Sequence, residues 1–217
     1  MSDKHHYDFP PQFDNPSNAH HIQINMVPEG SFVLDAGCHT GLLGETLIQK
    51  KGAKVVGVDL DDEAVEVAKK KLSDAFVLDL ENEDWTKKIS ERGYSHFDVI
   101  IFGDILEHTK NPEEILQQAQ GILKPEGRII VSIPNVAHWR VRFGLLFGRF
   151  EYQEAGILDR THLRFYTRKS GRTFVEKSGY RIIAEDVAGY SLPHWALRAL
   201  PGLLAVQNVF TAISNRK

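Results

Sequence analysis

An acid and two glycines occupy the turn that follows the first apolar run of the sequence. In the stretch VLDAGCHTG, the residues Asp35, Gly37 and Gly41 satisfy the pattern acid-x-Gly-x-x-x-Gly. A turn that binds the pyrophosphate of a dinucleotide has the pattern G-x-G-x-x-G, but here His39 takes the first glycine position, ahead of Gly41 and Gly44. The carboxylate of Asp35 would repel a pyrophosphate and attract a ligand that carries an ammonium group and a sulfonium. The turn therefore predicts a cationic ligand.

Short β-branched runs alternate with helical patterns along the chain, as in a parallel sheet covered by helices. The predicted strands are Ser31–Asp35, Lys54–Asp59, Ala75–Leu80, Phe97–Phe102, Arg128–Ile133 and Tyr180–Val187. The predicted helices are Leu42–Lys50, Glu63–Lys71, Trp85–Glu91, Pro112–Leu123 and Lys169–Ser178. The turn lies at the carboxyl end of the first strand, where open α/β sheets bind their ligands. The sequence thus predicts an α/β fold with a ligand at this edge.

The composition indicates one domain, because 217 residues with 42% hydrophobic content suffice for one full core. We divide the chain into an N-terminal arm, residues 1–27, and a domain, residues 28–217. An insertion, residues 135–166, follows the fifth strand. Long connections in a compact domain are more often functional than idle.

Net charge and cysteine content exclude several classes of partner. The formal net charge of −3, from 26 basic and 29 acidic residues, provides no field that attracts nucleic acid. The single cysteine, Cys38, excludes an intramolecular disulfide, and the N-terminus lacks the pattern of a signal peptide. No apolar run approaches the roughly 18 residues of a membrane span. We expect a cytoplasmic protein with a small-molecule partner, no nucleic acid and no membrane span.

The stretch VLDAGCHTG resembles the first motif, D-x-G-C-G-x-G, of the class I S-adenosylmethionine-dependent methyltransferases, and the likeness extends over most of the chain. The resemblance implies a Rossmann-like, seven-stranded, mostly parallel sheet with helices on both faces. The last strand, NVFTAIS here, would be antiparallel and lie between the fifth and sixth strands. S-adenosylmethionine would be the cofactor. His39 departs from the motif at its central glycine, and we expect a slightly reshaped loop beside the methionine end of the cofactor.

The resemblance also assigns cofactor contacts to the ends of the first three strands. The first motif would contribute Asp35, Gly37, Cys38, His39 and Gly41. Asp59, at the end of the second strand, would accept hydrogen bonds from both ribose hydroxyls, and Leu60 would pack on the adenine. After the third strand, Asp79 would accept a hydrogen bond from the adenine amino group, with Leu80 beside the ring.

In this family, the residues after the fourth strand lie between cofactor and acceptor. Gly103 and Asp104 would face the methionine moiety, and Glu107 and His108 would lie near the transferred methyl group. Methyl transfer from a sulfonium needs mainly alignment and desolvation, so a base is required only when the acceptor holds its proton tightly. The intrinsic pKa of His108 suits that task, and His162 is the second candidate. Alternatively, Glu107 and His108 only cap the following helix.

The insertion, residues 135–166, carries the most particular resemblance. Its PN...HWRVR stretch is similar to methyltransferases of the MetW type, and LD.TH.RF.T recurs in bacterial small-molecule methyltransferases, so we place the chain in a MetW-like and ubiquinone-methyltransferase-like subgroup. Its aromatic residues and arginines predict a partly mobile cover that binds an anionic group of the acceptor. The candidate substrate residues are Glu107, His138, Trp139 and Arg164. The alternative is a helical hairpin packed on the sheet edge, with its arginines in water.

Two further features carry weaker signals. The apolar segment Trp195–Leu204 packs on its own sheet, or forms the interface of a homodimer or a contact with a membrane surface. The adjacent pairs His5–His6 and His20–His21 point apart on a helix or a strand. Neither an H-x-x-x-H motif nor a cysteine pair accompanies them, so we expect no metal site.

A methyltransferase that acts on a small molecule is the favoured function, with oxygen or nitrogen as the acceptor atom left open. A non-catalytic S-adenosylmethionine-binding partner protein is the first alternative, and it would show no turnover. An NAD(P)-dependent oxidoreductase is the second, and Asp35 and His39 disfavour it.

Overall fold

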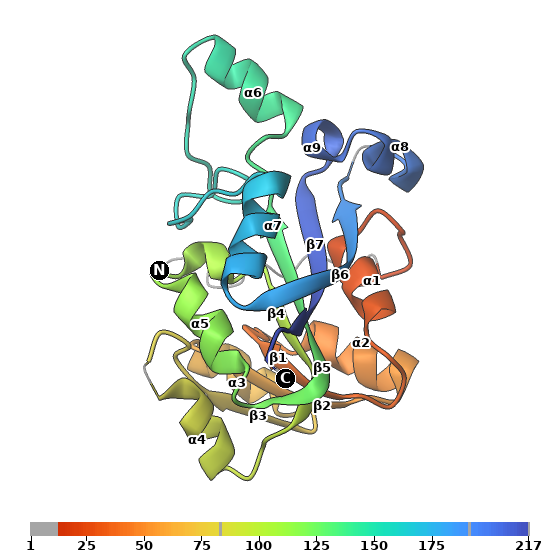
Figure 1. Ribbon diagram of the computed structural model, residues 1–217, viewed down its shortest axis with the longest axis vertical. Helices are drawn as coiled ribbons and strands as arrows, with labels where there is room; N and C mark the ends of the chain where they lie inside the picture. The colour runs from red at the N-terminus through yellow and green to blue at the C-terminus, as the bar shows by residue number, and fades with distance from the viewer. Residues whose placement is uncertain (1–12, 83, 191, 217) are drawn as a thin grey trace.

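The computed structural model describes residues 13–82, 84–190 and 192–216 and has one seven-stranded sheet at its centre (Figure 1). The strands are β1 (Phe32–Ala36), β2 (Lys54–Asp59), β3 (Asp74–Val77), β4 (Phe97–Gly103), β5 (Leu123–Pro134), β6 (Tyr180–Ala188) and β7 (Gln207–Ser214). Their order is β3-β2-β1-β4-β5-β7-β6. Neighbours from β3 to β5 are parallel, whereas β7 is antiparallel to both β5 and β6. The predicted Rossmann-like sheet and the place of its antiparallel last strand are confirmed.

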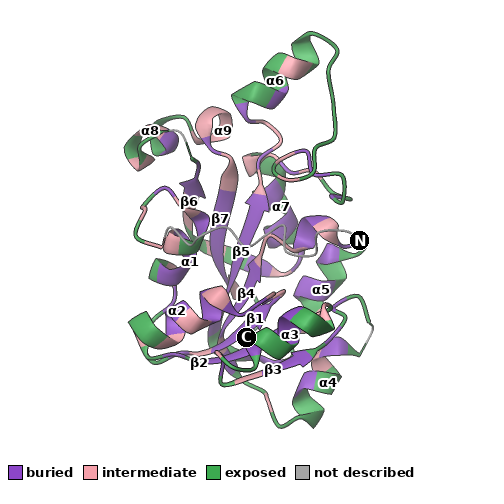
Figure 2. Cartoon of the chain, turned by 180° about the vertical axis from the view of Figure 1, so that it is seen from behind, coloured by how far each residue is buried: buried purple, intermediate pink, exposed green. Residues whose placement is uncertain are grey.

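Helices cover both faces of this sheet. They are α1 (Ala19–Met26), α2 (Leu42–Lys51), α3 (Asp62–Ala68), α4 (Trp85–Glu91), α5 (Pro112–Ala119), α6 (Trp139–Leu146), α7 (Arg168–Lys177), α8 (His194–Ala199) and α9 (Pro201–Leu204), with a short 3-10 helix, η1 (Leu106–His108). One buried cluster joins α4, α5 and α7 to the sheet, and a second joins α1, α2 and α3 to the opposite face. The strands between these layers are largely buried (Figure 2).

The central strands are buried on both faces, which explains their sequences. On β1, Leu34 belongs to one buried cluster and its neighbour Val33 to the other, because successive side chains of a strand point to opposite faces. Such strands consist of continuous apolar runs without polar alternation. Because β1, β2, β4 and β5 are parallel, the loops that follow them meet at one edge of the sheet, which we call the carboxyl edge.

Several predicted boundaries need correction. The third strand ends at Val77 and not at Leu80, since Asp79 already closes a turn with the backbone of Asn82. Helix α5 ends at Ala119, and Leu123, which was predicted to end this helix, begins the longer strand β5 by pairing with Phe97. The strand β2 and the helix α4 have the predicted bounds.

Helix α1 lies inside the predicted N-terminal arm and packs on the sheet. The side chain of Asn18 caps its N-terminus by accepting a hydrogen bond of 2.8 Å from the backbone N–H of His20. Ala19 and Ile22 are buried in the same cluster as β1 and α2. The sequence analysis did not identify this helix, although an Asn cap followed by apolar residues is a known helix signal.

The insertion has a buried base and an exposed tip. Its two ends meet in a β-bridge between Asn135 and Tyr166, and His138 and His162 are buried near this base. Helix α6 projects away from the sheet (Figures 1 and 2) and exposes 76% of Leu146. A hairpin packed flat on the sheet edge is therefore wrong for α6, whereas the base of the insertion is part of the domain.

The predicted apolar segment Trp195–Leu204 forms α8 and α9 beside the ends of β6 and β7 (Figure 1). Leu197 packs against Val187 of β6, while Trp195 is exposed. Part of the segment thus covers its own sheet, as expected. Among the residues that the structure describes, none of the helices has both the length and the apolar character that crossing a membrane requires.

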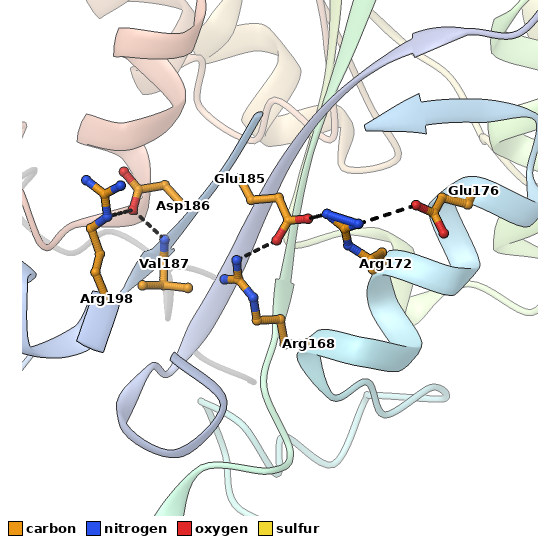
Figure 3. A network of polar contacts seen from close by, with 7 residues as sticks. All are labelled: Arg168, Arg172, Glu176, Glu185, Asp186, Val187 and Arg198. Carbon is orange, nitrogen blue, oxygen red and sulfur yellow. Dashed lines mark hydrogen bonds and ion pairs between the residues drawn. The ribbon is translucent and has the colours of Figure 1, made fainter. Parts of the chain in front are cut away.

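Glu185 on β6 joins the helix α7 to the sheet (Figure 3). Its carboxylate accepts hydrogen bonds from the guanidinium groups of Arg168, at 2.5 Å, and of Arg172. The side chain of Glu185 is only 11% exposed, so water screens these ion pairs weakly. The neighbouring pair between Arg172 and Glu176 is longer, at 3.7 Å, and about half exposed.

We predict that Glu185→Ala lowers the free energy of unfolding by about 1 to 2 kcal/mol, because it leaves two arginines without their shared acceptor. The control Glu176→Ala removes an exposed partner of the same Arg172 and should cost less than about 0.5 kcal/mol. Urea denaturation of both variants measures the difference. Equal losses would contradict the importance of the shielded pair.

Candidate functional site

The turn after β1 places three residues in the left-handed backbone region. Gly37, His39 and Gly41 have φ values of 85°, 45° and 75°. A Cβ atom on Gly37 would lie 2.4 Å from Cδ1 of Ile105, and one on Gly41 would lie 3.1 Å from the backbone of Ala68. Gly37 is thus required by both conformation and space. The turn brings its backbone close to the stretch that follows β4.

The backbone conformation of His39 explains why the first motif has a glycine at this position. Its positive φ is one that glycine adopts freely and that costs other residues about 1 to 3 kcal/mol. Its backbone N–H donates a hydrogen bond of 2.7 Å to Oδ2 of Asp59, which holds the loop against the end of β2. The loop therefore holds a histidine in a backbone conformation that glycine adopts freely. Cys38 beside it is buried, and burial raises the pKa of its thiol.

Asp35 is a buried carboxyl group at the centre of the sheet. It pairs with Gly57 of β2 on one side and with Ile101 of β4 on the other, and it is 3% exposed. Its Oδ2 atom has no hydrogen-bond partner among the described residues. Burial and the negative charge of Asp59 raise the pKa of Asp35 to about 7. This position can accommodate a positive charge, which would stabilise the ionised carboxylate.

Asp59 and Asp79 follow neighbouring strands at the same edge. Asp59 accepts hydrogen bonds from the backbone N–H groups of His39 and Asp61, and both of its oxygens retain lone pairs for a further donor. Leu60 beside it is 68% exposed. Asp79 is exposed and accepts a hydrogen bond from Glu81, but Leu80 is buried in the core.

The end of β4 contains a second strained residue. Asp104 has a φ of 53°, and its Oδ1 accepts a hydrogen bond of 3.0 Å from the hydroxyl of Ser132 on β5. Gly103 precedes it, and a Cβ there would lie 3.3 Å from Nε2 of Gln23. A strained aspartate that is fixed by a neighbouring strand marks this loop as a functional candidate.

Gln23 of α1 is a candidate site residue that the sequence analysis did not name. Its side chain is fully buried, and neither of its amide atoms has a hydrogen-bond partner in the described part of the chain. Its amide lies beside Gly103, at the end of β4. His20 of α1 and Tyr190, after β6, are also near enough to Asp104 for its charge to act on them. The Asn18 cap is the sequence signal that could have identified helix α1 and, with it, Gln23.

Three side chains that could do chemistry lie together beyond Asp104. Donor atoms of Glu107, His108 and His162 lie within 4.8 Å of one another, and the two imidazole rings are 4.7 Å apart between centroids. The sequence analysis named all three residues, and the structure brings them together. Burial and the charge of Asp104 raise the pKa of Glu107 well above its usual value. Burial, with a smaller contribution from His162, lowers the pKa of His108.

The remaining predicted substrate residues lie in or near the base of the insertion. His138 is buried and caps α6 by accepting a hydrogen bond from Arg140. Trp139 is 44% exposed, and the guanidinium of Arg140 lies 5.5 Å from its ring centroid. The guanidinium of Arg164 donates a hydrogen bond of 2.5 Å to the backbone oxygen of Lys110, just beyond η1.

Two surface hollows, of about 330 and 250 Å³, lie away from these residues. The first includes Gln117 and Asn215, and the second includes Gly30 and Arg128. Neither contains a motif residue. We place the site at the carboxyl edge because the buried carboxyl groups without partners, those of Asp35 and Glu107, and the amide of Gln23 lie there.

A family model described as a methyltransferase domain matches residues 20–185 of the chain. Together with the seven-stranded fold and the turn around Asp35, this match defines the class of protein. The chain belongs to the class I S-adenosylmethionine-dependent methyltransferases. The family match leaves no support for the alternative of a nicotinamide-dependent oxidoreductase.

Curated relatives and a solved structure agree with this class. The chain is 31% identical over 121 residues to a ubiquinone biosynthesis O-methyltransferase of Coxiella burnetii (strain Dugway 5J108-111), covering 56% of this chain and 51% of the relative. It is 29% identical over 188 residues to the protein of that name in Xanthomonas axonopodis pv. citri (strain 306), covering 85% and 76%. The chain therefore spans about half the length of the first relative.

The solved structure is that of the magnesium protoporphyrin IX methyltransferase from Synechocystis PCC 6803 with bound S-adenosylhomocysteine. It shares the fold, with a TM-score of 0.60 at 16% identity, over 89% of this chain and 78% of that one.

The residues at the carboxyl edge fit the cofactor of the family, S-adenosylmethionine. Its sulfonium and ammonium groups would supply the positive charge that the buried oxygen of Asp35 lacks. Asp59 has acceptor capacity for the ribose hydroxyls, and Leu60 offers an exposed apolar surface to adenine. Gln23 offers an amide at the end of β4. When bound, the cofactor supplies an activated methyl group for transfer.

We predict that binding of S-adenosylmethionine at pH 6 to 7 releases a proton from Asp35. In the free protein its pKa is about 7, and a bound cation lowers this pKa, so affinity should rise with pH up to about 7 and then level off. The same raised pKa means that the free protein loses stability as the pH rises from about 4 to 7. Calorimetry in two buffers of different ionisation enthalpy measures the release. Asp35→Asn should abolish it, and an unchanged release in that variant would contradict the assignment.

We predict that His39→Gly raises the free energy of unfolding by up to about 1 kcal/mol, because relief of the positive φ outweighs the added entropy of the unfolded chain. The matched control is His96→Gly, which removes another histidine with positive φ, at 58°, far from the turn in sequence. Both variants should keep the affinity for S-adenosylmethionine within about threefold of the parent. A tenfold loss in both His39→Gly and His39→Ala would show that the imidazole contacts the cofactor.

Proposed function

We propose that the protein transfers the methyl group of S-adenosylmethionine to a hydroxyl group of a small-molecule acceptor. The observation that carries this proposal is the pair His108 and His162, which lies beside the buried Glu107. Glu107 and His108 belong to the stretch that follows Gly103 and Asp104, which we assign to the cofactor. An uncharged amine is nucleophilic before it loses a proton, so it would not need such a group. A hydroxyl does need one, because it must lose its proton as it is methylated.

In this proposal, the cofactor extends across the ends of β3, β2, β1 and β4. Asp79 binds the adenine amino group, Leu60 packs on the ring and Asp59 holds the ribose. The cationic methionine end lies between Asp35 and the amide of Gln23. This orientation directs the methyl group toward η1, where His108 lies beside His162 of the insertion.

The reaction is an in-line displacement in which the acceptor oxygen attacks the methyl carbon and the carbon–sulfur bond breaks. The enzyme contributes alignment of the two groups and exclusion of water, which raise the rate without any covalent intermediate. The pKa of His108 is lowered, so its imidazole is neutral near pH 7 and retains a lone pair. The histidine pair thus assists the loss of the hydroxyl proton.

The names of the relatives support oxygen as the acceptor atom. Both the Coxiella and the Xanthomonas proteins are called ubiquinone biosynthesis O-methyltransferases. Because the chain spans about half of the first and is about 30% identical to either, we extend to it the hydroxyl chemistry and leave the particular acceptor open.

The insertion, residues 135–166, is the proposed cover of the acceptor. Its base contributes His162 to the histidine pair, and its exposed tip carries aromatic side chains such as Phe143 and Phe147. We assign Trp139 and Arg164 to acceptor contacts on this cover. His138 holds the start of α6 and so positions Trp139.

We also infer the surroundings in which the protein works. The net charge of −3 argues against nucleic acid as a partner. The absence of disulfide-forming cysteine pairs from the sequence agrees with a cytoplasmic location. The exposed Trp195 on α8 is the proposed centre of a homodimer interface.

The test is transfer of a labelled methyl group from S-adenosylmethionine to a panel of hydroxylated metabolites. The unchanged protein should label at least one of them. Asp59→Ala should weaken cofactor binding by about 1.5 to 3 kcal/mol, or roughly tenfold to a hundredfold. His162→Ala should lower kcat and leave the cofactor Kd unchanged, and His96→Asn should alter neither.

Two outcomes contradict the proposal. Cofactor binding without transfer to any hydroxylated compound would favour the non-catalytic S-adenosylmethionine-binding protein. Full activity of His162→Ala would show that the histidine pair takes no part in the methyl transfer.

A further inference from the structure

Two separate parts of the chain build the cluster of Glu107, His108 and His162. The first two residues lie on η1 directly after β4, and the third lies at the base of the insertion. The backbone oxygen of Glu107 accepts hydrogen bonds from the N–H groups of Leu163, at 2.8 Å, and Arg164, at 3.1 Å. These bonds fix the two segments against each other. The cluster is therefore part of the rigid fold and does not depend on chance encounters of surface side chains.

Glu107 is fully buried, and neither of its carboxyl oxygens has a hydrogen-bond partner among the residues that the structure describes. Burial of such a group without a partner is costly. The negative charges of Asp104 and Asp159 add to the cost of ionising Glu107. The guanidinium of Arg164 is bonded to the backbone oxygen of Lys110 instead. The carboxyl group thus has no cationic partner among the described side chains, and a cation beside it would stabilise its ionised form.

The hydrogen bonds of the two histidines leave the same ring nitrogen available in each. Nδ1 of His162 lies 3.2 Å from the backbone oxygen of Ile157, which can only accept, so Nδ1 carries the proton. The hydroxyl of Thr161 donates to Asp159 at 2.7 Å and therefore accepts, at 3.0 Å, from Nδ1 of His108. Nε2 of both rings then retains its lone pair. Metal-binding histidines typically have this arrangement, with the second nitrogen bonded to an oxygen.

We propose that Glu107, His108 and His162 bind a first-row divalent cation. Two imidazole nitrogens and one carboxylate oxygen suit Mn²⁺, Fe²⁺, Co²⁺ and Zn²⁺, whereas Mg²⁺ and Ca²⁺ prefer oxygen ligands alone. The donor atoms lie within 4.8 Å of one another, so small rotations of the side chains bring them to bonding distance. The sequence analysis expected no metal site because it considered the adjacent pairs His5–His6 and His20–His21, which no H-x-x-x-H motif or cysteine pair accompanies. His108 and His162 are far apart in the sequence, so no local pattern joins them.

Three protein ligands leave coordination positions open for an oxygen of the acceptor. This role of the cation rests on the proposed function. A hydroxyl bound to the cation loses its proton to water more readily, because the metal stabilises the resulting oxyanion. The oxyanion then forms the bond to the methyl carbon as the carbon–sulfur bond breaks, which yields the methyl ether and S-adenosylhomocysteine. The histidine pair would assist proton loss through the cation and not as a free base.

The test of the site is a titration of the chelator-treated full chain with Co²⁺ alone, followed by visible absorption. We expect one equivalent to bind, with d–d bands of a nitrogen and oxygen ligand set, and Zn²⁺ to displace it. Glu107→Gln and His162→Ala should each weaken binding by at least about tenfold. Azide should shift the spectrum, because open positions remain on the cation. Mg²⁺ at the same concentration should not compete.

Matched controls separate this site from other histidines. The sequence has ten histidines, including the adjacent pair His5 and His6. The double variant His5→Ala/His6→Ala and the single variant His96→Asn should bind Co²⁺ as the parent does. Circular dichroism of Glu107→Gln and His162→Ala shows whether each variant is folded. Thermal denaturation adds a second readout, since Co²⁺ should raise the Tm of the parent and of the controls but not that of the two site variants.

The outcomes distinguish the site from the proposed function. Failure of Co²⁺ and Zn²⁺ to bind the folded parent, or binding that persists in both site variants, overturns the site whatever the enzymatic activity. Stoichiometric binding that both site variants lose supports it, even if no acceptor is ever methylated. Once an acceptor is known, full activity after removal of the metal would overturn the role of the cation in the reaction and leave the methyltransferase assignment intact.

Discussion

Four carboxyl groups, those of Asp35, Asp59, Asp104 and Glu107, lie at the carboxyl edge of the sheet, and two of them are almost completely removed from water. Each raises the cost of ionising its neighbour: Asp59 acts on Asp35, and Asp104 acts on Glu107. A protein can sustain such a concentration of acidic groups only if it keeps some of them neutral or receives positive charge from a ligand. The edge is thus built to bind cationic groups, and the sulfonium cofactor of the family is one.

The rest of the fold makes this concentration possible. β1 and β4 lie side by side at the centre of the sheet, and both faces of each strand are covered by helices. This apolar packing stabilises the strands and leaves the conformation of their following loops free to serve binding. Two non-glycine residues, His39 and Asp104, take positive φ values in these loops. The backbone N–H of His39 donates a hydrogen bond to Asp59, and the side chain of Asp104 accepts one from Ser132. The stability of the sheet offsets the strain at its edge.

The predicted arm and the insertion each bring a side chain to the end of β4 or to the stretch that follows it. Helix α1 brings Gln23 to the end of β4, and the base of the insertion brings His162 to His108. Neither segment belongs to the regular alternation of strands and helices. The regular part of the fold therefore holds most of the residues proposed to bind the cofactor, whereas the irregular parts surround the region where the acceptor is proposed to bind. Such a division allows acceptors to differ among proteins with one common cofactor site.

The sequence by itself determined the family, the mostly parallel sheet and the place of its antiparallel last strand. The turn around Asp35 and the acid Asp59 are local patterns, each readable within a few residues of a strand end. The end of the third strand and the existence of α1 were missed, although the turn at Asp79 and the cap at Asn18 are local features. Only the tertiary structure decided that Glu107, His108 and His162 form one cluster and that Gln23 faces Gly103. Contacts between residues that are far apart in the sequence follow from how the chain packs, and no local pattern encodes their distance.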